Sequence, residues 1–278
     1  MGTLLWRPLN GLNRAELNKA RMQAHYAVQW LARCARAYVS ARPDDSHTNL
    51  GWDERAGGFS THSFGDGTCL HLRISDLTLV VLNAARNPPW LSLDGRTDAD
   101  VRVWLGGELS AKGFNLQKLD HPSPYEMPVH ALMNGGRYSI GGIIDALRDL
   151  SVWFANANAV LSNVRQQLES RGLNPPAVRC WPHHFDLDSL ILLGGEKTIG
   201  VGFSPGDDYY DEPYFYVSVY PEQDGMVLPH MSPIGHTHTH EFRAAIATAG
   251  KIVTMKEQGE ATETFILGSV ENAIKLLT

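Results

Sequence analysis

Two stretches of this chain carry short β-like segments that are separated by turns and not by helices. The first runs from Trp52 to Asn83 and the second from Val178 to Tyr220. Strands joined by short turns pair antiparallel, because a parallel pair needs a long crossover connection. Segments with apolar residues at helical spacing lie beside both stretches. The sequence therefore predicts an α+β fold, in which two antiparallel meanders are covered by long amphipathic helices.

The helical segments carry recognisable boundary residues. Asn13 followed by Glu16 matches a capping box, Thr97 is a good N-cap, and Gly113 and Gly172 supply stops. The long apolar stripe between Ile143 and Leu168 lies on one helical face. We expect helices over residues 13–42, 97–112, 143–168, 241–248 and 266–277.

The chain is long enough for a sizeable core in a single unit. With 278 residues, it can bury close to three quarters of its extended surface on folding. We expect residues 1–278 to fold as one compact unit. The Asn174-Pro175-Pro176 segment marks a sub-boundary near residues 172–177, between an N-terminal α+β half and a C-terminal β-rich half.

Charge and composition exclude several classes of partner. The formal net charge is −6, which argues against non-specific binding to nucleic acid or to an anionic membrane. No apolar run approaches the roughly 20 residues of a membrane span, and we find no signal peptide. The three cysteines show no C-x-x-C spacing. These features favour a cytoplasmic protein with a small-molecule ligand, and they leave homo-oligomerisation open.

Histidines concentrate in two short segments, 181–186 and 235–241. In an extended chain, residues i and i+2 share one face about 6.5–7 Å apart, so His236 and His238 can converge on one ion. The same rule separates His183 from His184 and places His184 beside Asp186. His184, Asp186, His236 and His238 are therefore predicted to hold one transition-metal ion, which suits Zn, Fe, Ni or Mn. The alternative is that these histidines are structural or solvated.

Acidic and aromatic residues follow in the segment from Asp207 to Tyr220. A carboxylate in a tyrosine-lined pocket can act as a general acid or base, and we assign this role to Asp207 or Glu241. The predicted substrate pocket is lined by His183, Tyr209, Tyr210 and Tyr214. Alternatively, the tyrosines only pack one face of a strand.

Two other catalytic motifs are rejected. Gly202-Phe203-Ser204-Pro205-Gly206 matches G-x-S-x-G, but Pro205 has no N–H for an oxyanion hole and no helix pattern follows. Ser204 is therefore expected to belong to a turn and not to act as a nucleophile. The glycine pairs lack the further residues of a Rossmann or P-loop motif, so no nucleotide cofactor is expected.

Two longer motifs carry a resemblance. They are Trp181-Pro182-His183-His184-Phe185-Asp186 and the segment SPGDDYYDEPYFYV, residues 204–217. With them, the chain resembles an uncharacterised bacterial family of the domain-of-unknown-function kind. The resemblance implies a soluble bacterial protein and supplies no activity, cofactor or catalytic residue.

Two functions from different classes follow from these patterns. The leading hypothesis is a metal-dependent enzyme, hydrolytic or oxidative, that acts on a small molecule. Its alternative is a non-catalytic protein that binds a small molecule or has a structural, oligomeric role. Metal content distinguishes the two.

Overall fold

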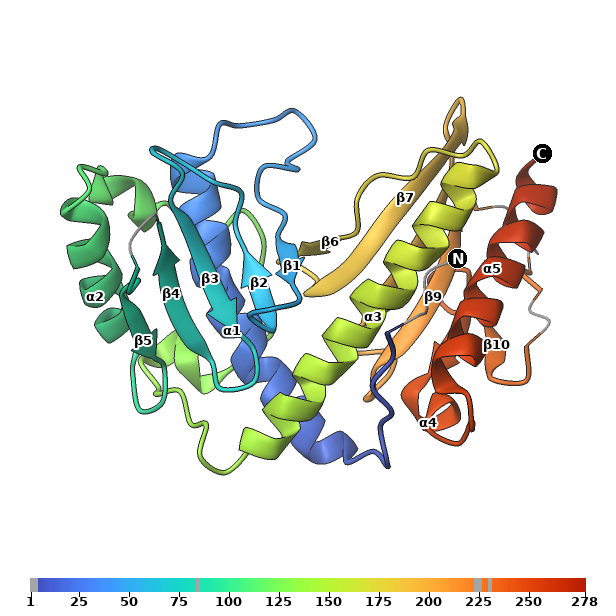
Figure 1. The fold of residues 1–278 in the computed structure, drawn as a ribbon, viewed down its shortest axis with the longest axis horizontal. Coiled ribbons are helices and arrows are strands. Elements are labelled where there is room, and N and C mark those ends of the chain that lie inside the picture. The colour runs from blue at the N-terminus through green and yellow to red at the C-terminus, as the bar shows by residue number, and fades with distance from the viewer. Residues whose placement is uncertain (1–4, 84–85, 223–226, 230–231) are drawn as a thin grey trace. The chain divides into compact units, whose positions relative to one another are not determined.

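The computed structural model describes residues 5–83, 86–222, 227–229 and 232–278, and it divides into two compact units. The six-stranded unit contains Met1–Arg14, Val152–Arg179 and Asp186–Thr278, and the five-stranded unit contains Ala15–Ser151 and Cys180–Phe185. Both sheets are antiparallel and are packed with long helices, so the predicted α+β class is confirmed (Figure 1). The division does not fall at residues 172–177, because the chain up to Arg179 groups with the six-stranded unit. Folding as one cooperative unit stays a prediction.

The five-stranded unit is a meander whose strands pair in chain order. Its sheet lies against the long helix α1, which runs behind it in Figure 1. The elements of this unit are α1 (Arg14–Tyr38), β1 (Gly51–Asp53), β2 (Gly58–Ser60), β3 (Cys69–Arg73), β4 (Thr78–Leu82), β5 (Trp90–Ser92), α2 (Asp98–Ser110) and the 3-10 helices η1 (Leu116–Asp120) and η2 (Ala131–Asn134).

Local sequence explains where α2 begins. The Thr97 hydroxyl accepts the backbone N–H of Asp100, and the Asp100 carboxylate accepts the backbone N–H of Thr97. This reciprocal pair is a capping box, which stabilises a helix start by about 1 kcal/mol. The turn after the helix includes Gly113, which adopts φ +81°. Both boundary predictions for this helix are confirmed.

The six-stranded unit pairs its strands in the order β10-β11-β9-β8-β7-β6. Its elements are α3 (Ile144–Ser170, of which this unit takes the part from Val152), β6 (Arg179–Trp181, of which this unit takes Arg179), β7 (Asp186–Gly194), β8 (Lys197–Ser204), β9 (Tyr214–Tyr220), β10 (Gly235–His238), β11 (Ala244–Thr248), α4 (Ala249–Ile252) and α5 (Gln258–Leu277).

Helices α3 and α5 cover one face of this sheet and create its core. The ring of Phe203 on β8 packs against Trp153 and Phe154 of α3, at centroid distances of 6.2 and 5.5 Å. Helix α5 packs on β8, β9 and β11, and Asn163 of α3 donates to Glu263 of α5 at 2.9 Å. Strand residues alternate between faces, so the neighbours of these core residues lie on the opposite face. We call that opposite face the tyrosine face, because β9 places Tyr214 and Tyr216 there.

The helix expected over Glu241 to Thr248 is wrong. Ala244–Thr248 forms strand β11, which pairs with β10 on one side and β9 on the other. All five residues are buried. Pairing on both edges overrules the helix propensity of the alanines, and Glu241 has φ +63°, which no α-helix accepts.

The separation of His183 from His184 onto opposite faces of a strand is also wrong. Residues 182–185 form a turn, in which the N–H groups of His184 and Phe185 both donate to the Trp181 carbonyl at 3.2 and 2.7 Å. Strand alternation does not apply in a turn, and the two imidazole centroids lie 4.2 Å apart. The buried Phe185 ring, stacked on His25 at 5.3 Å, holds this turn in place.

Candidate functional site

Strand β10 places two imidazoles beside one hydroxyl. His236 and His238 lie opposite Ile246 and Ala244 of β11, so both point to the tyrosine face. The Tyr210 hydroxyl oxygen lies 2.9 Å from Nε2 of His236 and 2.9 Å from Nδ1 of His238. The i, i+2 spacing in the sequence thus brings these two side chains to one point. All three residues are partly exposed to solvent.

The loop that carries Tyr210 is held by Asp207. Its carboxylate accepts the backbone N–H groups of Tyr209 and Tyr210 at 2.9 and 3.0 Å, and it also accepts the hydroxyl of Tyr214. Burial, with the nearby Asp207 charge, raises the pKa of Tyr214, so this phenol stays protonated and donates. Asp207 therefore acts as the anchor of the loop.

Ser204 begins the same loop. It ends strand β8, and its side-chain oxygen accepts the N–H of Gly206 at 3.2 Å, where Gly206 has φ +112°. Ser204 is buried and is followed by a turn and not by a helix. This is the turn that the sequence predicted, and it differs from the strand–turn–helix geometry of a serine nucleophile.

A second polar pair crosses the sheet from β9 to β7. Tyr216 donates its hydroxyl to Oδ2 of Asp186 at 2.7 Å, and its ring passes over Gly202 of the strand between them. The other carboxylate oxygen of Asp186, Oδ1, is buried without a hydrogen-bond partner. Burial raises the pKa of Asp186 to about 6, against 3.8 for an ordinary aspartate. This carboxyl can therefore hold a proton close to neutral pH.

Aromatic rings enclose His238. Phe242 stacks on its imidazole at 4.1 Å, and Tyr209 meets it edge-on at 5.6 Å. The Tyr209 hydroxyl donates to Glu241 at 2.5 Å, which places Glu241 at the rim of this cluster. The Nε2 atom of His238 lies 2.6 Å from the carbonyl oxygen of His240. His238 is thus fixed on three sides.

The predicted site residues fall into both units. His183 and His184 belong to the five-stranded unit, whereas Asp186, His236 and His238 belong to the six-stranded unit. Among the described residues, no group of three or more His, Cys, Asp and Glu side chains is placed to hold a metal ion. Within the six-stranded unit, the structure joins His236 with His238. Metal binding stays a prediction.

The predicted pocket residues are divided in the same way. Tyr209, Tyr210 and Tyr214 lie together on the tyrosine face, and the rings of Tyr210 and Tyr214 are 4.8 Å apart. His183 instead contacts Tyr125 of its own unit at 5.6 Å, and burial lowers the pKa of His183 to about 4.

Sequence reasoning missed Tyr216, Gly202 and Glu212. Glu212 is buried, pairs with Arg14 at 2.8 Å and accepts the N–H of Gly250 at the start of α4. A signal existed for Gly202, because a glycine inside a strand marks a place where another group approaches closely. The partners of Tyr216 and Glu212 depend on strand register and long-range packing, which no local pattern shows.

No protein-family model matches this sequence, and no curated protein matches it. Among the described residues, no helix has both the length and the apolar character needed to cross a membrane.

Proposed function

We propose that this protein is a metal-dependent enzyme for a small polar molecule, in which His236, His238 and Tyr210 hold a transition-metal ion. The observation that carries this proposal is the convergence of two imidazole nitrogens on one phenolic oxygen, 2.9 Å from each. Two nitrogen donors and one oxygen donor suit Zn, Fe, Ni or Mn better than Ca or Mg. Three protein ligands leave coordination positions open for water or substrate, as in catalytic zinc sites.

The tautomer of His238 supports a ligand role. A carbonyl oxygen only accepts, so the contact with His240 requires the hydrogen of His238 to be on Nε2. The Nδ1 atom then presents its lone pair towards Tyr210. Histidine ligands of metals are commonly oriented in this way, by a hydrogen bond from the second ring nitrogen to a carbonyl or carboxylate.

The three donor atoms need to move only slightly for a metal ion to bind between them. Two donors bound to one ion at about 2.1 Å in tetrahedral geometry lie about 3.4 Å apart. Each imidazole nitrogen is 2.9 Å from the Tyr210 oxygen, so each of these two N–O distances would have to widen by about 0.5 Å. Tyr210 lies in a loop held by Asp207 and can supply this movement without displacing the strand.

Asp186 is the better candidate for proton transfer than Asp207 or Glu241. Asp207 already accepts three hydrogen bonds, and Glu241 accepts from Tyr209 at the exposed rim. Asp186 has an oxygen without a partner and a pKa near 6, so it can exchange a proton near neutral pH. Asp186 therefore takes the acid–base role in this proposal.

The test is metal content and metal titration of untagged protein. We expect close to one ion per chain after incubation with Zn, Ni, Mn or Fe and dialysis, measured by elemental analysis. The His236→Ala, His238→Ala double variant should lose the ion. His240→Ala is the matched control, because it removes the third imidazole of the run and keeps the backbone carbonyl that orients His238.

The role of the Tyr210 hydroxyl in metal binding is tested by comparing substitutions at Tyr210 and Tyr209. Tyr210→Phe removes the hydroxyl and keeps the ring packing, so metal affinity should fall at least tenfold, and the phenolate charge-transfer band expected with Fe(III) should disappear. Tyr209→Phe should leave both unchanged. Absence of binding for every metal, or equal loss in His240→Ala, would contradict the proposed site.

A further inference from the structure

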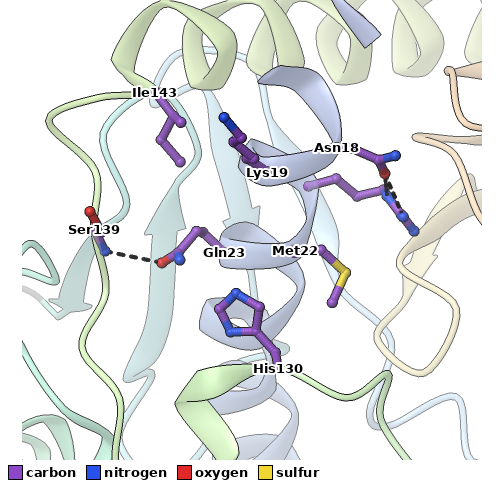
Figure 2. A pocket seen from close by; sticks show the side chains of 8 residues that line it. Asn18, Lys19, Met22, Gln23, His130, Ser139 and Ile143 are labelled. Carbon is purple, nitrogen blue, oxygen red and sulfur yellow. Dashed lines mark hydrogen bonds between the residues drawn. The ribbon is translucent and has the colours of Figure 1, made fainter. Parts of the chain in front are cut away.

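A pocket of about 490 Å³ lies within the five-stranded unit, on the N-terminal half of α1. Its volume falls in the range of small-molecule sites. Figure 2 shows Lys19, Met22 and Gln23 on the helix and Ser139, Ile143 and His130 around it, the last three from the chain after α2. None of its described lining residues belongs to the six-stranded unit, so this pocket is independent of the metal-site proposal.

Two acceptor oxygens of the pocket are already occupied by groups of the protein. The side-chain oxygen of Gln23 accepts the backbone N–H of Ser139 at 3.2 Å. The side-chain oxygen of Asn18 accepts two N–H groups of Arg21, at 3.0 and 2.6 Å. Each of these amides keeps its NH₂ group as a donor.

The ring of His130 also accepts a hydrogen bond from the protein and keeps a donor. Its Nδ1 atom accepts the backbone N–H of Leu132 at 3.3 Å, where it caps η2. Burial lowers the pKa of His130, which favours the neutral ring, and the neutral ring then carries its hydrogen on Nε2. His130 thus also offers a donor.

The lining of the pocket also carries positive charge. Lys19 and Arg21 line the pocket, and none of its described lining residues is acidic. Lys19 uses one N–H for Glu16 at 2.8 Å, which leaves two more donors on the ammonium group. The side chains of Met22 and Ile143 add apolar surface at two separate places of the lining (Figure 2). A ligand for this pocket needs acceptor atoms, negative charge and a short apolar part.

We propose that this pocket binds a small organic oxyanion, a carboxylate or a phosphate ester, through Lys19 and the surrounding N–H and O–H donors. The apolar part of the ligand lies against Met22 and Ile143. Charge-assisted hydrogen bonds to an oxyanion are about twice as strong as neutral ones, which gives the site its selectivity over neutral molecules.

The test is titration of the full chain, followed by amide chemical shifts in NMR, with three probes. Hexanoate carries a carboxylate on an apolar chain, hexanamide has the same chain without charge, and inorganic phosphate is the oxyanion alone. We expect hexanoate to shift the amides around Lys19 and Ser139 with millimolar affinity, and hexanamide to bind at least tenfold more weakly. A stronger response to phosphate than to hexanoate would assign the site to phosphate esters.

Two variants and one control connect binding to the pocket. Lys19→Gln should weaken hexanoate binding about tenfold. Ser139→Ala removes only a hydroxyl and keeps the backbone N–H bound by Gln23, so it should weaken binding without loss of structure. Lys118→Gln changes an exposed lysine outside the pocket and should have no effect. Equal binding of hexanoate and hexanamide, equal weakening in Lys118→Gln, or no binding of either anion would overturn the proposal.

Discussion

A single methyl group added at Gly202 tests how the tyrosine face is built. The Cβ of Gly202→Ala would lie 2.4 Å from the Cζ and hydroxyl atoms of Tyr216 and 2.7 Å from the carbonyl oxygen of Leu187. The ring must move, and the move breaks its hydrogen bond to Asp186. Overpacking costs roughly 1–3 kcal/mol, and an unpaired buried acceptor costs roughly 1–3 kcal/mol more. Less the roughly 0.5–1 kcal/mol gained when any strand glycine becomes alanine, we expect a loss of about 3 kcal/mol.

Gly200→Ala is the matched control on the same strand and the same face. Its Cβ would lie 2.6 Å from the Ser218 hydroxyl oxygen, which can rotate away, and 4.0 Å from the Tyr216 ring. Replacing a strand glycine by alanine also gains roughly 0.5–1 kcal/mol in chain entropy. The net change should stay within about 1 kcal/mol.

The assay is urea unfolding of both variants, followed by far-ultraviolet circular dichroism. In a Tyr216→Ala background, Gly202→Ala should cost at least about 1 kcal/mol less than in the native chain, because neighbouring substitutions are not additive. Some cost should remain from the Leu187 carbonyl. Equal destabilisation by the two glycine substitutions, or full additivity with Tyr216→Ala, would refute the reasoning.

Three further predictions concern buried charges, each measured by urea unfolding. Burial raises the pKa of Asp186 to about 6, so its contribution to stability is present below pH 4 and is lost as pH rises through 6. Asp186→Asn should remove this fall, which is at most about 3 kcal/mol; an unchanged profile would contradict the assignment. Burial lowers the pKa of His71 to about 4, so stability should instead fall as pH drops from 6.5 towards 4, and His71→Gln should flatten that fall by up to about 3 kcal/mol. Glu212→Gln should cost about 1–2 kcal/mol at pH 7 by weakening its contacts with Arg14 and Gly250, whereas Glu260→Gln, on exposed α5 surface, should cost under about 0.5 kcal/mol.

The features predictable from sequence are those that local chemistry decides. Three examples involve residues only a few positions apart. They are the capping box at Thr97, the apolar helix stripe that begins at Ile143, and the shared face of His236 and His238. The two-meander α+β class follows from the same kind of evidence, because turn spacing alone favours antiparallel pairing.

Features that depend on distant partners were not predictable. Residues 244–248 are alanine-rich, and only the presence of β9 and β10 on both sides makes them a strand. The bridging role of Tyr210 requires a loop to bring its hydroxyl to a strand 26 residues away. The turn at 182–185 depends on burial of Phe185 against His25, which is 160 residues earlier in the chain.

Strand alternation on β9 divides the core residues from the residues of the tyrosine face. On β9, Phe215, Val217 and Val219 fill the core. Tyr214 and Tyr216, which alternate with them, lie on the tyrosine face. Substitutions in the first set create cavities and should lower stability directly. Hydroxyl removal in the second set leaves the core intact, although the Tyr216 ring still depends on the space that Gly202 leaves on the adjacent strand. Gly202 therefore supports the tyrosine face, even though it has no side chain to contribute.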